Sequence, residues 1–251
     1  IKELDETTGR VHGYVNPNGA VTSRMTHSHP NMAQIPSSSS PYGEDCRACW
    51  TVPEDYRLVG IDASGLELRM LAHYLNDEGY TNEILNGDIH TANQRLADLE
   101  SRDQAKTFIY ALLYGAGDAK LGSVVGRGRA HGKGLRQRFF DNLPSFKKLT
   151  DRVQREAKSG FIKALDGRKL TVRSEHAALN TLLQGAGAIV MKKALIILDE
   201  TIRTNNWDAK FVANVHDEWQ IECHLDDAVD VGKAGVEAII QAGIELNLNC
   251  P

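Results

Sequence analysis

The stretch that decides the fold is LVGIDASGLELR, residues 58–69. Its first four residues are apolar and too few for an ordinary helix, so they predict a buried strand that ends at Asp62. The apolar residues that follow recur at helical spacing and predict a helix over 64–76. A strand, a tight turn and a helix therefore follow one another directly, with an aspartate at the junction.

A second aspartate, Asp217, comes just after another apolar run, FVANV at residues 211–215. We predict two strands over 211–224, joined by a turn at His216 and Asp217. Carboxylates delivered by two separate strands can hold two hard cations side by side, because Mg²⁺ prefers oxygen ligands. Asp62 and Asp217 therefore predict a site for metal-assisted phosphoryl transfer.

The rest of the chain predicts a β-rich start, followed mainly by helices with one hairpin among them. Residues 1–57 are typical of irregular, β-rich structure, and GRGRAHGKG at 126–134 predicts a basic, glycine-rich connector. One predicted helix runs over 80–99 with a break at 86–88, and the next is capped by Ser101 and ends at Tyr114. Further helices are predicted at 135–142, 144–159, 176–204 and 226–246, and a hairpin at 161–172. The pattern predicts an α+β fold, with a small antiparallel sheet and a helical insertion.

The net charge of −4 conceals a strong asymmetry along the chain. Residues 101–173 carry 17 Lys+Arg against 6 Asp+Glu, net +11, whereas the remainder carries 12 against 27, net −15. Local charge matters more than the total, because salt confines electric fields to about 10 Å. The segment predicts a polyanion-binding surface, with a solvated helical face as the alternative.

Composition also limits the compartment and the class of protein. No run approaches the roughly 18–20 apolar residues of a membrane span, so we expect no membrane partner. Four cysteines suggest no disulfide framework, and Cys46 and Cys49 form a CxxC without the second clustered pair that a zinc site needs. The chain begins at Ile1 rather than Met, so we interpret it as a fragment or a processed product.

Four side chains recur every four residues along the helix after Ser101: Arg102, Lys106, Tyr110 and Tyr114. Steps of four keep neighbours on one side of a helix, and the row spans about 18 Å. Two cations followed by two rings suit a nucleoside triphosphate, with phosphates, sugar and base in that order. The alternative is a surface cation pair followed by two core tyrosines. P-loop and nucleophile-elbow motifs are absent, which disfavours a P-loop ATPase and a serine hydrolase.

Four ordered motifs complete the pattern: DASGLELR (62–69), RDQAKTFIYALLYG (102–115), HAALNTLLQ (176–184) and VHDE (215–218). Together they resemble the motifs of family A DNA polymerases, in particular the phage T-seven group. The resemblance covers residues 13–223 and implies a right-hand polymerase fold. Residues 1–76 and 165–251 would then form the palm and 77–164 the fingers, with thumb and exonuclease outside the chain.

The resemblance implies catalytic roles for four residues, and a metal-binding role for the Ala63 carbonyl beside two of them. Asp62 and Asp217, with the Ala63 carbonyl, would bind two Mg²⁺ ions, and Glu218 would lie beside them. Lys106 would bind the triphosphate and protonate the departing pyrophosphate.

Further residues would bind the substrates by the same resemblance. Glu67 would be a steric gate against the ribose 2′-hydroxyl and would pair with Tyr110. The residues expected to contact the dNTP are Glu67, His90, Arg102, Lys106, Tyr110 and Tyr114. The residues expected to contact DNA are Arg24, Gln34, Asn180, Gln184 and His216.

The resemblance implies a template-directed DNA polymerase that uses primer-template DNA and dNTPs in phage replication, in the cytoplasm of a bacterial host. A processivity factor would bind to a segment outside this chain. One alternative is a single-subunit RNA polymerase, which shares the aspartates and the lysine helix but against which Glu67 argues. Another is a non-catalytic nucleic-acid-binding module that uses 101–173. Trp219, beside the acidic pair, has no role in this scheme.

Overall fold

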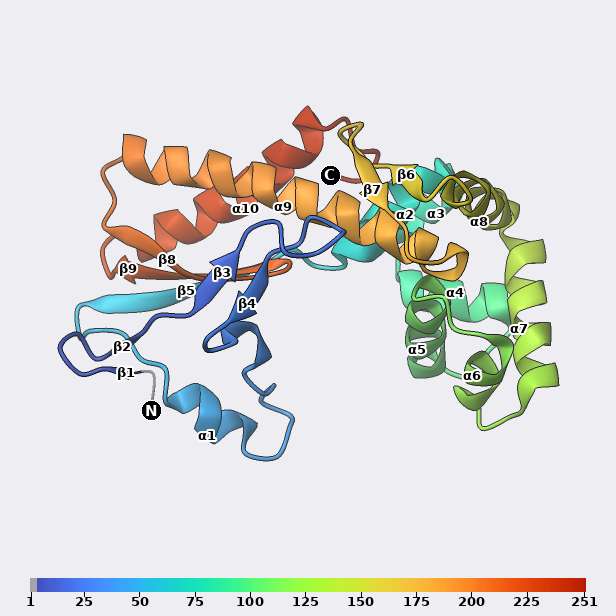
Figure 1. The fold of residues 1–251 in the computed structure, drawn as a ribbon, viewed down its shortest axis with the longest axis horizontal. Helices are drawn as coiled ribbons and strands as arrows, with labels where there is room; N and C mark the ends of the chain where they lie inside the picture. Colours follow the sequence, from blue (N-terminus) through green and yellow to red (C-terminus); the bar gives the residue numbers. More distant parts are fainter. Residues whose placement is uncertain (1–3) are drawn as a thin grey trace. The chain divides into compact units, whose positions relative to one another are not determined.

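Two compact units make up the part of the chain that the structure describes. The computed structural model describes residues 4–251. The sheet unit comprises residues 4–64 and Ala188–Glu245, and the helical unit comprises Gly65–Gly187 and Leu246–Pro251. Helices and antiparallel strands occur in both units (Figure 1), which confirms the predicted α+β class. The assignment of palm and fingers to their predicted ranges stays a prediction.

A three-stranded antiparallel sheet lies at the centre of the sheet unit. Its strands are β5 (Tyr56–Asp62), β8 (Ala209–Val215) and β9 (Glu218–His224), in the order β5-β9-β8. The sequence predicted all three strands, because each is an apolar or alternating run bounded by turn residues. The hairpin of β8 and β9 brings its turn back beside the end of β5.

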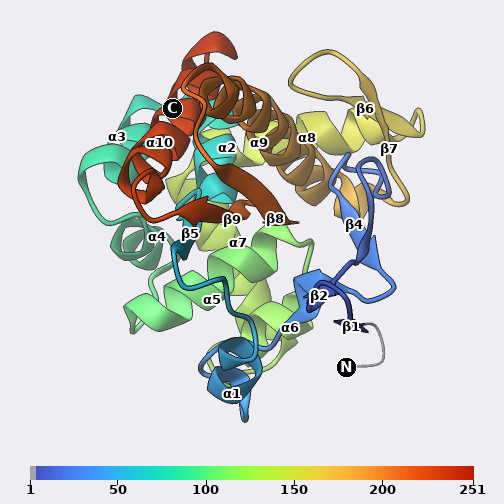
Figure 2. The ribbon, with the colours of Figure 1, turned by 90° about the vertical axis from the view of Figure 1, so that its left-hand side faces the viewer.

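Helix α10 (Ala228–Glu245) covers one face of this sheet, as Figure 2 shows. Gly235 makes the close approach possible, because a Cβ atom there would overlap the Ile61 side chain of β5. Trp219 is fully buried, lies opposite Ile61 in the strand register, and meets the Phe211 ring edge-on at 6.2 Å. The tryptophan beside the acidic pair is therefore a core residue of the sheet unit.

The chain before β5 is anchored to the sheet unit by two cations. Arg10 donates to the buried Glu222 carboxylate at 2.6 Å, and Lys192 donates to the Pro17 carbonyl at 2.6 Å. Its elements are β1 (Leu4–Asp5), β2 (Arg10–Val11), β3 (Tyr14–Asn16), β4 (Thr26–Ser28), the 3₁₀ turn η1 (Met32–Gln34) and α1 (Gly43–Ala48). The hairpins confirm the β-rich prediction for 1–57, of which residues 1–3 lie outside the described part. The short helix α1 was not predicted.

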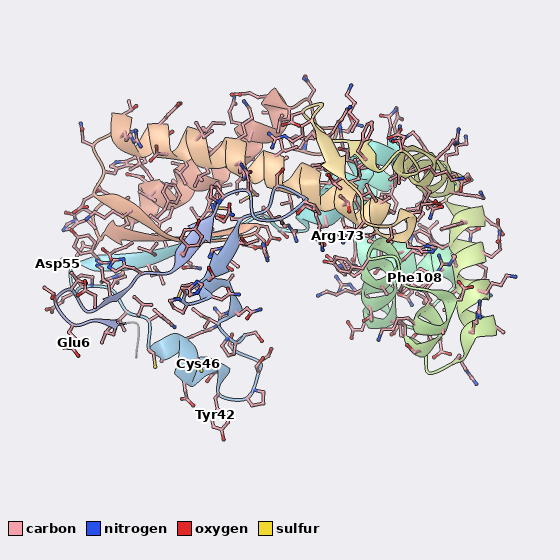
Figure 3. The ribbon with its side chains drawn as sticks, viewed as in Figure 1. Glu6, Tyr42, Cys46, Asp55, Phe108 and Arg173 are labelled. Atoms are coloured by element: carbon pink, nitrogen blue, oxygen red, sulfur yellow. The ribbon has the colours of Figure 1, made fainter. Side chains whose placement is uncertain are left out.

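The helical unit is built around an aromatic cluster. Its elements are α2 (Leu66–Leu75), α3 (Glu78–Asn86), α4 (Ile89–Ala97), α5 (Arg102–Leu113), α6 (Asp118–Ser123), α7 (Arg129–Asn142), α8 (Pro144–Ala157), β6 (Phe161–Lys163), β7 (Lys169–Thr171) and the first part of α9 (Ala178–Thr204). Phe108, which Figure 3 labels, lies 5.7 Å from Phe139 between ring centroids, and Phe139 lies 5.2 Å from Phe146. All three rings are fully buried, so α5, α7 and α8 share one core.

Two helices of this unit start directly after a short polar residue, of which Ser101 was predicted as a cap and Asp88 as part of a break. The Asp88 carboxylate accepts from the His90 N–H at 3.0 Å, and α4 begins there after the predicted break. The Ser101 hydroxyl accepts from the Gln104 N–H at 3.2 Å, and α5 begins at the next residue. Both caps were readable because a short polar side chain precedes each helical run.

The glycine-rich connector predicted at 126–134 is wrong for its second half, where α7 begins at Arg129. Helix α6, immediately before it, was also missed. Gly132 is buried, and a Cβ atom there would overlap the Asp118 carbonyl oxygen of α6. This glycine therefore permits two helices to pack in close contact, whereas the glycine-rich sequence around it predicted irregular structure.

Helix α9 is the longest among the described residues. With the 3₁₀ turn before it (Glu175–Ala177, η2), it is long and apolar enough to cross a membrane by length and composition. Polar residues interrupt this helix, so it contains no uninterrupted apolar run of membrane length, and the expectation of no membrane partner stays a prediction. Of its apolar window, 67% is buried within the structure, and core helices pass the same test.

Candidate active site

The two predicted metal-binding aspartates lie at the same edge of the sheet. Asp62 is the last residue of β5, and it faces Glu218, the first residue of β9, in the strand register. The next residue, Ala63, donates its N–H to the Asp217 carbonyl at 2.9 Å. Strand pairing thus brings Asp62, Asp217 and Glu218 together from segments about 155 residues apart in the sequence.

Negative charge accumulates at this edge. Partial desolvation first, and then the carboxylates of Asp217 and Glu218, raise the pKa of Asp62, although its side chain still reaches solvent. Among residues 4–251 no three His, Cys, Asp or Glu side chains are already arranged as a metal site. Two aspartates with a nearby carbonyl are nevertheless oxygen donors that suit a hard divalent cation, which would relieve their repulsion. The donor set therefore fits Mg²⁺.

The turn that carries Asp217 has an unusual backbone. His216 has φ of +59°, a left-handed conformation that glycine or asparagine adopts more easily. Such a residue in a two-residue hairpin turn stores backbone strain, which tends to occur at functional sites. The exposed His216 and the half-buried Arg24 line one small pocket with Lys192 and Asn214.

Two of the predicted DNA contacts thus share one pocket of the sheet unit. Gln34, a third, ends η1 on the surface and does not line that pocket. Lys192 and Asn214 were not predicted as site residues. A lysine inside the apolar run of α9 is the sequence signal that would have pointed to Lys192.

Helix α5 carries the predicted row of cations and rings. Arg102, Lys106 and Tyr114 are exposed and Tyr110 is half-buried, whereas the opposite side of the helix, including Phe108, is buried. The alternative of two core tyrosines is therefore wrong for Tyr114. The row presents an accessible side of the helix, as a ligand-binding role requires.

His90 joins this row from α4. Its ring lies 6.3 Å from the Tyr110 ring, and its Nδ1 atom is buried without a hydrogen-bond partner within residues 4–251. Burial first, and then the charges of Arg102 and Lys106, lower the pKa of the imidazole. The structure therefore brings four of the predicted nucleotide contacts together.

Asp88 is a residue of this cluster that the sequence reading did not assign to it. Arg102 donates to its carboxylate at 2.6 and 3.2 Å. This bond first, with help from Thr91, holds the pKa of Asp88 well below its usual range. A phosphate that binds Arg102 would compete with this carboxylate. The helix-capping signal at Asp88 was visible in the sequence, but its contact with Arg102 was not.

Glu67, the predicted steric gate, lies in the first turn of α2. The Tyr114 hydroxyl donates to both of its carboxylate oxygens, at 3.1 and 3.2 Å. The expected pairing with Tyr110 stays a prediction, while this bond from Tyr114 was not foreseen. It links α2 to the end of α5 inside the helical unit.

The remaining predicted DNA contacts, Asn180 and Gln184, lie four residues apart on α9. Both are half-buried, and the spacing puts them on one side of the helix. They belong to the helical unit, whereas the aspartate pair belongs to the sheet unit.

This order of elements, with an aspartate pair on an antiparallel sheet and a cation-tyrosine helix, is that of a polymerase family. The model of DNA polymerase family A matches residues 1–251, and the chain belongs to that family. It is 46% identical to the DNA-directed DNA polymerase of Escherichia phage T7, over 96% of this chain and 39% of that protein. The same figures hold for the DNA-directed DNA polymerase of Enterobacteria phage T3.

A solved structure shares the fold. It is the POL domain of Pol1 from M. smegmatis in complex with DNA primer-template and dNTP, with a TM-score of 0.88 and 25% identity. The match covers 96% of this chain and 46% of that one. The chain spans 39% of the length of the phage relatives named above, so it corresponds to a part of those proteins.

Proposed function

We propose that this chain carries the nucleotidyl-transfer site of a template-directed DNA polymerase. The reaction joins the 3′-hydroxyl of a primer to the α-phosphate of a dNTP and releases pyrophosphate. The observation that carries the proposal is the meeting of Asp62 and Asp217 at one edge of the sheet, where Glu218 adds to their charge. The phage relatives are DNA polymerases, and the Pol1 structure holds primer-template and dNTP, which supports the same substrates here.

The aspartate pair has a defined task in this proposal. Asp62 and Asp217, with the Ala63 carbonyl, would hold two Mg²⁺ ions, which supply Lewis-acid activation of the primer hydroxyl and charge neutralisation at the pyrophosphate. Glu218 keeps the site acidic. The strained turn at His216 aims the Asp217 side chain.

The row on α5 has the complementary task of binding the triphosphate. Arg102 and Lys106 neutralise phosphate oxygens, and His90 can donate a further hydrogen bond to them. Lys106 is the group that returns a proton to the departing pyrophosphate. Tyr110 would lie beside the sugar, and Glu67 would exclude a 2′-hydroxyl from the same place.

Nucleic-acid contacts complete the proposal. Arg24 and His216 at their shared pocket, Gln34 on η1, and Asn180 and Gln184 on α9 would contact the primer-template. Side-chain amides can read the acceptors that every base pair presents in the minor groove, so they would test pairing rather than sequence. By its similarity to phage polymerases, the protein would act in phage replication in the cytoplasm of a bacterial host.

Primer extension by the purified full-length protein tests the proposal. Extension should require Mg²⁺ and should fall at least about 100-fold in the Asp217→Ala variant. Asp226→Ala is the matched control, because Asp226 is an exposed aspartate of the same unit, beyond the end of β9. It should retain the parent rate. Undiminished extension by Asp217→Ala would contradict the assigned site.

Two outcomes would favour the other functions. Binding of primer-template without extension, in the parent and in Asp217→Ala alike, would favour a non-catalytic module. A parent protein that prefers ribonucleotides would favour an RNA polymerase. If Glu67 is the gate, Glu67→Ala should raise ribonucleotide incorporation, and unchanged sugar selectivity would remove Glu67 from that role.

A further inference from the structure

The hairpin of β6 and β7 has one apolar face and one cationic face. Ile162 and Leu170 lie opposite each other and are 1% and 2% exposed, so they attach the hairpin to the core of the helical unit. Phe161, Lys163 and Lys169 alternate with them and are exposed. The hairpin, yellow in Figure 1, therefore presents its basic face to solvent.

The two lysines of this face lie directly opposite each other in the strand register. Side chains in such positions have their Cβ atoms about 5 Å apart, and like charges there destabilise the pair. Neither lysine forms an ion pair with a carboxylate within residues 4–251. The nearest acidic candidate in the turn, Asp166, is engaged at 2.6 Å by Arg168. An anion between Lys163 and Lys169 would therefore convert a repulsive pair into a binding site.

An aromatic ring lies beside the lysines. Phe161 is 37% exposed, and the Lys169 Nζ atom lies 4.3 Å from its ring centroid. A large ring at a charged surface exposes apolar area that a nucleobase can cover, and such stacking tolerates any base. Arg173, which Figure 3 labels, follows two residues after β7 and is a further exposed cation.

We propose that this face, called the hairpin face and made of Phe161, Lys163, Lys169 and Arg173, binds single-stranded nucleic acid. One phosphate would lie between the two lysines, a base would cover the Phe161 ring, and the next phosphate would meet Arg173. The ring favours a nucleic-acid strand over an acidic peptide, because a peptide needs the cations but not the stacking surface. This inference rests on the proposed function in one respect, which is that the bound strand is DNA rather than RNA.

The test measures the affinity of the full-length protein for a fluorescent oligothymidylate by anisotropy, over a range of salt. Loss of the phosphate contact that the two lysines share, in Lys163→Ser with Lys169→Ser, should reduce the salt slope by about 0.7, which is about 5-fold in affinity at 0.1 M salt. The control is Lys147→Ser with Arg203→Ser, which also removes two exposed cations. Those two are already paired with Asp151 and Asp199 on their own helices, so their loss should change the slope less.

A second variant separates stacking from charge. Phe161→Leu keeps the charges and the apolar contact and should weaken oligothymidylate binding without a change in the salt slope. An unchanged affinity in both hairpin variants would overturn the inference. A hairpin face that binds a polyglutamate peptide equally well, with no effect of Phe161→Leu, would overturn it in favour of an acidic protein partner.

Extension of a primer by one nucleotide, on a template whose single-stranded overhang is one nucleotide long, distinguishes the two proposals, because that overhang supplies the templating base and little further single strand. The hairpin variants should extend it at the parent rate, because the hairpin face is not among the residues assigned to nucleotidyl transfer. A parent protein that cannot extend it contradicts the proposed function, whereas the effects of the hairpin variants on binding would still stand.

Discussion

Two identical substitutions on helix α7 should have opposite effects on stability. At Gly132, a Cβ atom would overlap the Asp118 carbonyl oxygen and would lie 2.5 Å from the Gly122 nitrogen. At Gly134, two residues later, the nearest atom to a Cβ would be the flexible end of Arg138, at 3.7 Å. Gly132→Ala therefore forces α6 and α7 apart, whereas Gly134→Ala meets open space.

The expected changes in the free energy of unfolding follow from packing and helix propensity. An extra methyl group in a packed interior costs about 1–3 kcal/mol, and the upper value applies at Gly132 because the obstacles are backbone atoms that cannot rotate away. Alanine in place of glycine returns up to about 1 kcal/mol inside a helix. The free energy of unfolding should thus fall by about 2 kcal/mol in Gly132→Ala and rise by about 0.5–1 kcal/mol in Gly134→Ala.

Thermal unfolding followed by circular dichroism checks this pair of values. At about 2–4 °C per kcal/mol for a protein of this size, the Tm of Gly132→Ala should fall by about 4–8 °C and that of Gly134→Ala should rise by about 1–4 °C. Equal shifts in one direction would refute the close contact between α6 and α7. A Gly132→Ser variant should behave like Gly132→Ala, since the overlap comes from the Cβ atom alone.

Three further predictions concern the candidate active site. The pKa of Asp62 is raised above its unfolded value of 3.8, so its ionisation lowers stability as the pH rises from 3.8 through the folded pKa. The gain in Tm on Asp62→Asn should therefore grow from pH 3.5 to pH 7. A gain that does not depend on pH would contradict this cause. Asp88→Asn keeps the cap of α4 but weakens the bond to Arg102, so the KM for dNTP in primer extension should fall; an increase would show that the pair positions Arg102 for its substrate. Tyr114→Phe removes the donor to Glu67, so ribonucleotide incorporation should rise by less than in Glu67→Ala, and an equal rise would mean that the bond is essential to the gate.

Local sequence signals were sufficient wherever a few neighbouring residues decide the structure. The strand that ends at Asp62 and the helices that begin after Asp88 and Ser101 were each predicted from short patterns, and the structure confirms them. The apolar side of α5 was also readable, because its period matches the helix. The connector at 126–134 was misread, because the glycine there serves a partner helix rather than its own segment.

Contacts between distant segments could not be read in the same way. The resemblance implied Tyr110 as a partner of Glu67, which stays a prediction, and the bond from Tyr114, one helical turn later, was not foreseen. The bond between Asp88 and Arg102 was equally hidden. Side-chain partners depend on how elements cross, and a shift of one turn changes the partner without changing either pattern.

The sequence by itself determined the class of the fold, the family, and the choice of Asp62 and Asp217 as candidate metal ligands, because each depends on short runs of residue types in a fixed order. Tertiary structure alone decided that Asp62 faces Glu218 in the strand register, that Trp219 fills the core behind them, and that Lys163 faces Lys169. The physical reason is that charge repulsion, burial and pKa depend on distances in space, and strand register sets those distances between residues far apart in the chain.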